Sequence, residues 1–152
     1  MVRHTTRRMS RAAVRADPPP GRAAPVPTGV FDLLEQSRRC LADSAREPAA
    51  ARRFATAHLA ALRAAAAVLG VRTRPAARAG GRPPNAWALL AKVAPELGEW
   101  ATFFAAGAAK RAAAEAGLAH VVTDREADDL LRDATRFVNL CEASIGVLSS
   151  PG

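Results

Sequence analysis

Apolar residues recur every three or four positions along most of the chain, the spacing that places them on one face of an α-helix. Val30, Leu33, Leu34 and Leu41 form the first of these stripes. Proline, glycine and capping residues separate five such stripes, and the last continues for about five helical turns. The pattern predicts helices over residues 28–45, 48–69, 85–93, 95–117 and 123–145.

Several helix boundaries carry recognisable signals. Thr123 and Glu126 have the spacing of a capping box, in which each side chain accepts a hydrogen bond from an otherwise unpaired backbone N–H. Asn85 is a suitable N-cap for the third helix. Pro48 is predicted to be the first residue of the second helix, because the N–H that proline lacks is unpaired there. Gly70 is predicted to end that helix.

Two segments are not predicted to form helix or strand. One precedes the first stripe, and the other lies between the second and third stripes. Five prolines among the first 27 residues block a helix, so residues 1–27 are predicted to be a disordered Arg/Pro-rich arm. Residues 70–84 hold three prolines, three glycines and four arginines, which predicts a mobile loop. The folded domain is therefore expected to span residues 28–148.

Composition supports the helical assignment. The chain of 152 residues has 38 alanines and no tyrosine, a balance that favours helices over strands. We expect an all-α fold, a compact antiparallel bundle of four to five helices. Its few large side chains are expected to lock the core, namely Phe54, Trp87, Trp100, Phe104 and Phe137.

The helix over 95–117 carries a second apolar stripe. One stripe includes Leu97 and Phe104, and another is formed by Phe103, Ala106 and Gly107. Each apolar face of a helix is expected to pack against other apolar surface, away from water. The helix is therefore either central in the bundle or part of a dimer interface.

The formal charge of +8 is unevenly distributed. Residues 1–25 hold six arginines and one aspartate, residues 72–82 hold four arginines, and the remaining segments are close to neutral. Such basic segments either contact phosphates or are simply solvated, and both alternatives remain open. No uncharged stretch approaches the roughly 20 residues that span a bilayer, so no membrane association is expected. Cys40 and Cys141 lie far apart, which is typical of reduced thiols in a cytoplasmic protein.

The sequence contains none of the motifs that mark a metal, nucleotide or cofactor site, so no metal and no cofactor are expected. Arg53 and His58 are the one suggestive pair, since a guanidinium can hold a phosphate and an imidazole can transfer a proton near neutral pH. Five residues of helix place the two side chains about 140° apart. His58 also shares an apolar stripe with Phe54 and Leu62, so a hydrogen-bonded core histidine is the favoured interpretation.

A basic groove is a further candidate. It would form between the second and fourth helices if these are neighbours, from Arg52, Arg53, Arg63, Lys110 and Arg111. The alternative is that these side chains lie along apolar surface with their charged ends in water.

Taken as a set, the helices resemble HEPN domains. The opening helix pair of those domains is similar to residues 53–70, RFATAHLAALRAAAAVLG. The later helices of a small bacterial branch of the superfamily, of the high-GC, actinobacterial type, resemble residues 85–117 and READDLLRDATRFVNLCE at 125–142. The resemblance covers about Val30–Ile145.

The resemblance implies an all-α bundle, frequent dimerisation, and roles in RNA cleavage, nucleotide binding or pairing with nucleotidyltransferase-type partners. Nuclease members carry an R-x4–6-H motif on a late helix, whereas Arg53 and His58 lie on the second helix here. Lys110 and Arg111 are followed by no histidine until His120, which lies outside that spacing. We therefore expect a non-catalytic binding or accessory module, a homodimer with an RNA or protein partner. The alternative is a metal-independent endoribonuclease that uses Arg53 and His58.

Overall fold

The computed structural model describes residues 26–73 and 85–149, with side chains described as far as Gly146. These residues form five α-helices and two short 3-10 turns, and no strand occurs among them. In chain order the elements are α2 (Thr28–Arg46), α3 (Ala50–Arg72), α5 (Ala86–Val93), η1 (Pro95–Leu97), α6 (Gly98–Glu115), η2 (Ala119–Val121) and α7 (Asp124–Ser149).

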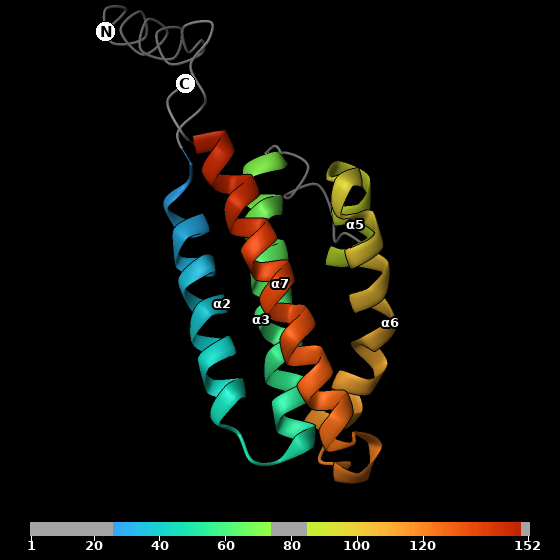
Figure 1. Ribbon diagram of the computed structural model, residues 1–152. Helices are drawn as coiled ribbons and strands as arrows, with labels where there is room; N and C mark the ends of the chain where they lie inside the picture. Colours follow the sequence, from blue (N-terminus) through green and yellow to red (C-terminus); the bar gives the residue numbers. More distant parts are fainter. Residues whose placement is uncertain (1–25, 74–84, 150–152) are drawn as a thin grey trace, which may run out of the picture.

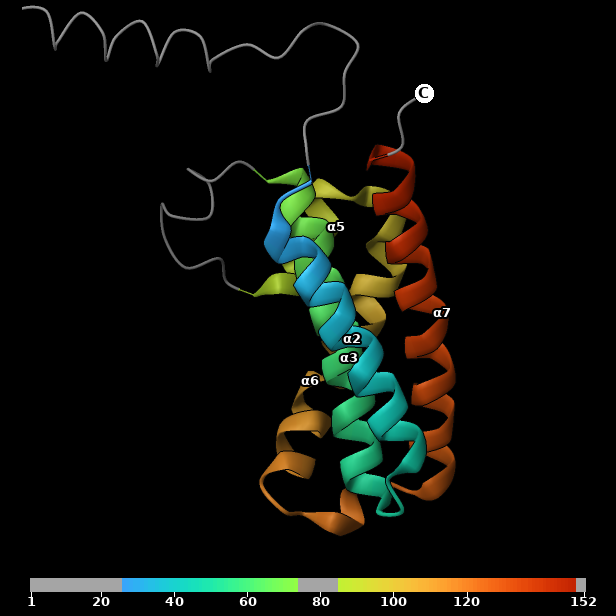
Figure 2. The ribbon, with the colours of Figure 1, turned by 90° about the vertical axis from the view of Figure 1, so that its left-hand side faces the viewer.

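The four long helices run alternately up and down, which confirms the predicted antiparallel bundle (Figure 1). Helix α3 lies at the centre and packs against α2, α7, α6 and the short α5. Helices α5 and α6 lie on the side of α3 away from α2 (Figures 1 and 2). The arrangement therefore leaves α2 and α6 at opposite edges, with α3 and α7 between them.

Small side chains allow α3 to occupy the centre. Eight of its twelve buried residues are alanines, and six of these, from Ala57 to Ala67, have no exposed surface. Alanine faces let helix axes approach to the short end of the usual 8–10 Å range. Among the described helices, α3 is also the one that is long and apolar enough to cross a membrane, but 56% of its apolar window is buried inside the bundle. This burial is what a central core helix requires.

Large aromatic rings fill the space between α3, α5, α6 and α7. Phe54, Trp87, Phe104 and Phe137 are buried, as predicted. Phe104 is the centre of the cluster, with its ring centroid 5.0 Å from Phe137 and 5.2 Å from Trp87. Trp100 is partly exposed but stacks on Phe104 at 6.1 Å.

The predicted capping signals are present. Asn85 Oδ1 accepts a hydrogen bond from the Ala88 N–H at 2.6 Å. At the start of α7, Thr123 Oγ1 accepts from the Glu126 N–H, and Glu126 Oε1 accepts from the Thr123 N–H. The capping box is therefore confirmed.

Two predicted boundaries of α3 are wrong. The helix begins at Ala50, two residues after Pro48. It continues through Gly70 to Arg72, because packing of this turn outweighs the weak helix propensity of glycine. Residues 70–72 of the predicted loop are therefore helical, and the backbone N–H of Thr73 caps the helix by donating to the Leu69 carbonyl. The rest of that loop, and residues 1–25 of the arm, lie outside the described residues.

Helix α6 lies at an edge of the bundle. Ala101, Phe104 and Ala114 are its buried residues, and it packs against α3 and α5. Phe103, on the second apolar stripe, is 45% exposed. A central position for this helix is therefore wrong, while a dimer interface on it stays a prediction.

Candidate functional site

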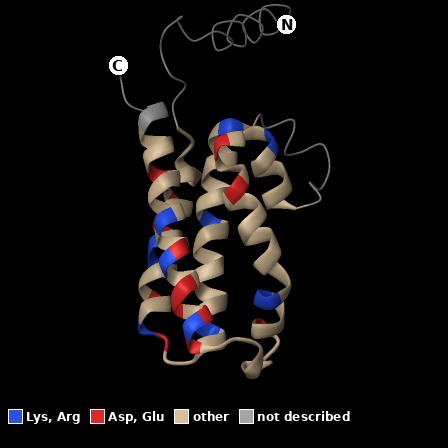
Figure 3. Cartoon of the chain, turned by 45° about the vertical axis from the view of Figure 1, so that its right-hand side comes forward, with Lys and Arg blue, Asp and Glu red and all other residues tan. Residues whose placement is uncertain are grey.

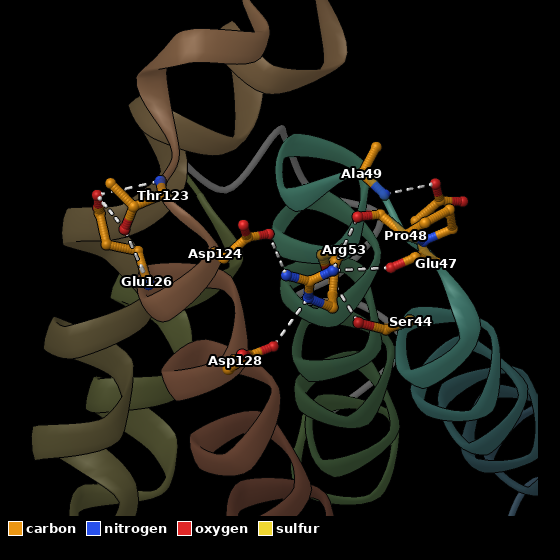
Figure 4. A network of polar contacts seen from close by, with 9 residues as sticks. All are labelled: Ser44, Glu47, Pro48, Ala49, Arg53, Thr123, Asp124, Glu126 and Asp128. Atoms are coloured by element: carbon orange, nitrogen blue, oxygen red, sulfur yellow. Dashed lines mark hydrogen bonds and ion pairs between the residues drawn. The ribbon is translucent and has the colours of Figure 1, made fainter.

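Arg53 joins three parts of the bundle, namely α3, the connection between α2 and α3, and the start of α7 (Figure 4). Its Nη1 donates to the Glu47 carbonyl at 2.8 Å and to the Pro48 carbonyl at 3.2 Å, which closes the connection between α2 and α3. Its Nη2 donates to Asp124 Oδ1 at 2.8 Å on the first turn of α7. The guanidinium is thus held by two elements besides its own helix.

The remaining nitrogen of Arg53 faces a second carboxylate. Nε lies 3.0 Å from Asp128 Oδ1, an ion-pair distance, although the N–H does not point at the oxygen well enough for a hydrogen bond. The Arg53 side chain is only 11% exposed, whereas the two aspartates are largely exposed. Two carboxylates and two carbonyls therefore already occupy the groups with which this arginine would hold a phosphate.

His58 lies in the aromatic core with no exposed surface. Its ring packs edge-on against Trp87 and Phe104, each at 5.8 Å between centroids. Nε2 lies 2.8 Å from the Phe104 carbonyl, and because a carbonyl only accepts, this nitrogen carries the proton. Nδ1 is buried and has no hydrogen-bond partner.

Burial determines the charge of His58. Loss of hydration lowers the pKa of the imidazole below its ordinary 6.5, and the positive charge of Arg111 adds to that effect. The Phe104 carbonyl and Glu115 act in the opposite direction. The imidazole is therefore neutral at neutral pH, and it has no surface exposed to solvent.

Gly107 of α6 lies directly over His58. A Cβ on Gly107 would be 3.5 Å from His58 Cδ2 and 3.8 Å from Phe54 Cζ. These are ordinary van der Waals distances, so α6 approaches α3 here as closely as an alanine would still permit. His58 thus links α3 to α6 through the Phe104 carbonyl, while Arg53 links α3 to α2 and α7.

The proposed basic groove is not assembled. Lys110 pairs with Glu126 across to α7, and Arg111 pairs with Glu115 one turn along α6. Arg63 lies beside Cys40 of α2, where its charge partly offsets the burial that raises the pKa of this thiol. Arg63 therefore lies on the other side of α3 from the two α6 residues.

Arg52, the remaining basic candidate, is exposed on the first turn of α3. The charged side chains concentrate on α7, and α6 carries few (Figure 3). Within the described residues, no group of three or more His, Cys, Asp or Glu side chains could hold a metal ion.

A groove between α6 and α7 is a concave feature that the sequence did not assign to any site. It has a volume of about 560 Å³, and its apolar lining comes from Phe54, Phe103, Ala106, Gly107 and Leu130. Its polar lining comes from Thr102, Lys110, Glu126, Asp129 and Asp133. The apolar stripe of Phe103, Ala106 and Gly107 in the sequence indicated the wall of this groove that α6 forms. The acidic wall was not predicted, because nothing in the sequence indicates that α6 and α7 face each other.

These features define a class: an antiparallel α-helical bundle with a buried, neutral histidine in its core and an arginine held by carboxylates at one end. A family model, described as SAV_6107-like HEPN, matches residues 42–142. The chain therefore belongs to the HEPN family, as the resemblance predicted. Comparisons with curated proteins and with solved structures gave no match.

Proposed function

We propose that this chain is a non-catalytic HEPN module that binds another protein. The observation that carries the proposal is the state of His58, which is fully buried, neutral and bonded through Nε2 to the Phe104 carbonyl. A general base must come within about 3 Å of the proton that it removes. A histidine enclosed by Phe54, Trp87 and Phe104 offers no such approach to an RNA 2′-hydroxyl.

The charge of the bundle favours a protein partner over RNA. Residues 26–73 and 85–149 hold 13 basic and 13 acidic side chains, so this part of the chain has no formal net charge. RNA binding usually requires a basic surface, since neutralising phosphates supplies most of the affinity. The exposed large apolar side chains are instead Phe31, Phe103, Leu118 and Leu140. Such side chains are typical of surfaces that bind proteins.

A homodimer is part of the proposal. The support is Phe31, a large apolar side chain that is 54% exposed beside a groove between α2 and α7. Light scattering on the purified chain should give twice the 15.9 kDa mass of one copy. A mass of one copy at micromolar concentration would contradict the dimer.

A cleavage assay tests the absence of catalysis. The purified chain is incubated with structured RNA in EDTA, next to a His58→Gln variant, in which the glutamine amide keeps a donor to the Phe104 carbonyl. We expect neither protein to cut the RNA. Cleavage by the wild type that the folded His58→Gln variant lacks would refute the non-catalytic proposal and support the endoribonuclease alternative.

RNA binding is tested separately by titrating the same RNA at several salt concentrations. The proposal expects no binding that depends on bundle residues, so Lys110→Gln should leave any residual affinity unchanged. A large loss of RNA affinity in this variant would show that the bundle surface binds RNA after all.

A further inference from the structure

The upper part of the α6–α7 groove combines aromatic rings with carboxylates. A pocket of about 350 Å³ is lined by Glu99, Trp100 and Phe103 of α6 and by Asp133 of α7. The rings of Trp100 and Phe103 meet edge-to-face at 6.4 Å. Aromatic faces beside carboxylates are a favourable site for a cationic side chain, above all the planar guanidinium of arginine.

The carboxylates of this pocket are available. Lys110 pairs with Glu126 and Arg132 pairs with Asp129, so these two acids of the groove already have partners. Glu99 and Asp133 have no ion pair with any described residue. The groove therefore presents two free negative charges beside an apolar floor.

The opposite charge is found in the same chain. The described bundle is neutral, and residues 1–25 carry six arginines against one aspartate. Four of these, Arg7, Arg8, Arg11 and Arg15, alternate with the apolar residues Met9, Ala12, Ala13 and Val14. The first 25 residues thus combine positive charge, which matches the carboxylates of the groove, with small apolar side chains, which match its apolar floor.

We propose that residues 1–25 bind in the α6–α7 groove of their own chain, with an arginine in the pocket of Glu99, Trp100, Phe103 and Asp133. Small apolar residues next to that arginine cover Ala106, Gly107 and Leu130 further down the groove. The segment then competes with any partner protein for the same surface. That regulatory consequence rests on the proposed function, whereas the binding of the segment does not.

The connection is long enough. Residue 26 lies at the start of α2, at the same end of the bundle as the start of α6 (Figure 1). An extended chain of 25 residues spans roughly 80 Å, several times the width of a small helical bundle. Residues 1–25 can therefore pass around the end of the bundle to the groove without stretching.

The test compares backbone amide NMR spectra of the full chain with those of two charge variants. The arm variant carries Arg7→Gln, Arg8→Gln, Arg11→Gln and Arg15→Gln, and the groove variant carries Glu99→Gln and Asp133→Asn. We expect the arm variant to shift the amides of residues 99–107 and 129–133, and the groove variant to shift those of residues 1–25. Both sets of shifts should disappear in 1 M salt, where charges are screened beyond about 3 Å.

A matched control separates the groove from charge in general. Asp32→Asn with Glu35→Gln removes the same two charges from the exposed face of α2, and it should leave the amides of residues 1–25 unchanged. Shifts of equal size in this control would refute the proposal. An arm variant whose shifts stay within residues 1–25 would refute it as well.

A mixing experiment shows whether the residues 1–25 that fill a groove come from the same chain or from a second copy. Isotope-labelled arm variant is mixed with unlabelled wild type, so that only a wild-type arm from another copy could restore the labelled groove. We expect no restoration. Recovery of the wild-type shifts at residues 99–107 would place the arm of a second copy in the groove and overturn the intramolecular proposal. None of these spectra involves RNA, so their outcome is independent of the cleavage assay.

Discussion

His58 makes the stability of the bundle depend on pH in a predictable direction. Burial lowers the pKa of the folded imidazole, while in the unfolded chain the pKa returns to about its ordinary 6.5. Between these two values the unfolded state binds a proton that the folded state does not. Stability is therefore fully present above the unfolded pKa and falls as the pH drops below it.

The magnitude follows from linkage. The upper limit is set by an imidazole that stays neutral throughout in the folded chain. Moving from about pH 7.5 to about pH 5.5 then costs roughly 1–2 kcal/mol, the free energy of protonating one group a pH unit below its unfolded pKa. Hydrogen bonds lower the pKa of Glu96 and Glu126 from 4.5, so the stability that these groups add is lost only at more acid pH.

Urea unfolding at the two pH values measures this difference, with the His58→Gln variant as the control that lacks the titration. The wild type should lose stability between the two pH values, by at most roughly 1–2 kcal/mol, and the variant should lose only a small part of the wild-type loss. Equal losses in both proteins would show that His58 does not titrate as a buried group. A wild type that is more stable at the lower pH would refute the burial argument itself.

Further predictions concern packing and links between helices. Phe104→Ala should lower the free energy of unfolding by ~3–5 kcal/mol, because it empties the centre of the aromatic cluster, and an unchanged melting temperature would contradict this role. Gly107→Ala should raise stability by up to about 1 kcal/mol, since the new Cβ meets His58 at ordinary contact distance and alanine favours helix; a clear loss would mean that α6 lies closer to α3 than described. Arg53→Gln should cost about 2 kcal/mol, mainly through the lost bonds to the carbonyls of Glu47 and Pro48, and thermal unfolding would measure it. Thr123→Ala should cost about 1 kcal/mol through loss of the capping box, and a loss of helix signal without a change in stability would be inconsistent with that.

Local rules predicted the parts of the fold that depend on neighbours in sequence. The Thr123–Glu126 capping box and the Asn85 cap each need only three or four residues, and both are present. Apolar residues at helical spacing likewise predicted that the rings of Phe104 and Phe137 are buried, which the structure confirms. Gly70 was misleading because packing of the surrounding turn against other helices outweighs an intrinsic penalty of about 1 kcal/mol.

The candidate site could not be derived in the same way, because it depends on which helices become neighbours. Lys110 and Glu126 are 16 residues apart and Arg53 and Asp124 are 71 apart, and only the tertiary arrangement brings these charges together. The sequence shows the arginines and the lysine, but not the carboxylates that neutralise them. The basic groove was therefore a reasonable hypothesis from one set of charges alone.

The spacing of Arg53 and His58 matches a nuclease motif, yet the two residues act on different neighbours. Five positions along a straight helix turn them about 140° apart, so Arg53 reaches the start of α7 and His58 reaches the Phe104 carbonyl of α6. Each side chain thus holds α3 to a different helix, and bringing them onto one phosphate would break both links. A nuclease that relied on this pair would have to unfold part of its own core in each reaction. The cleavage assay with His58→Gln and the pH dependence of unfolding therefore test the proposal from two sides: the loss of stability in acid measures the burial of His58, and the cleavage assay measures whether that burial keeps RNA from the imidazole.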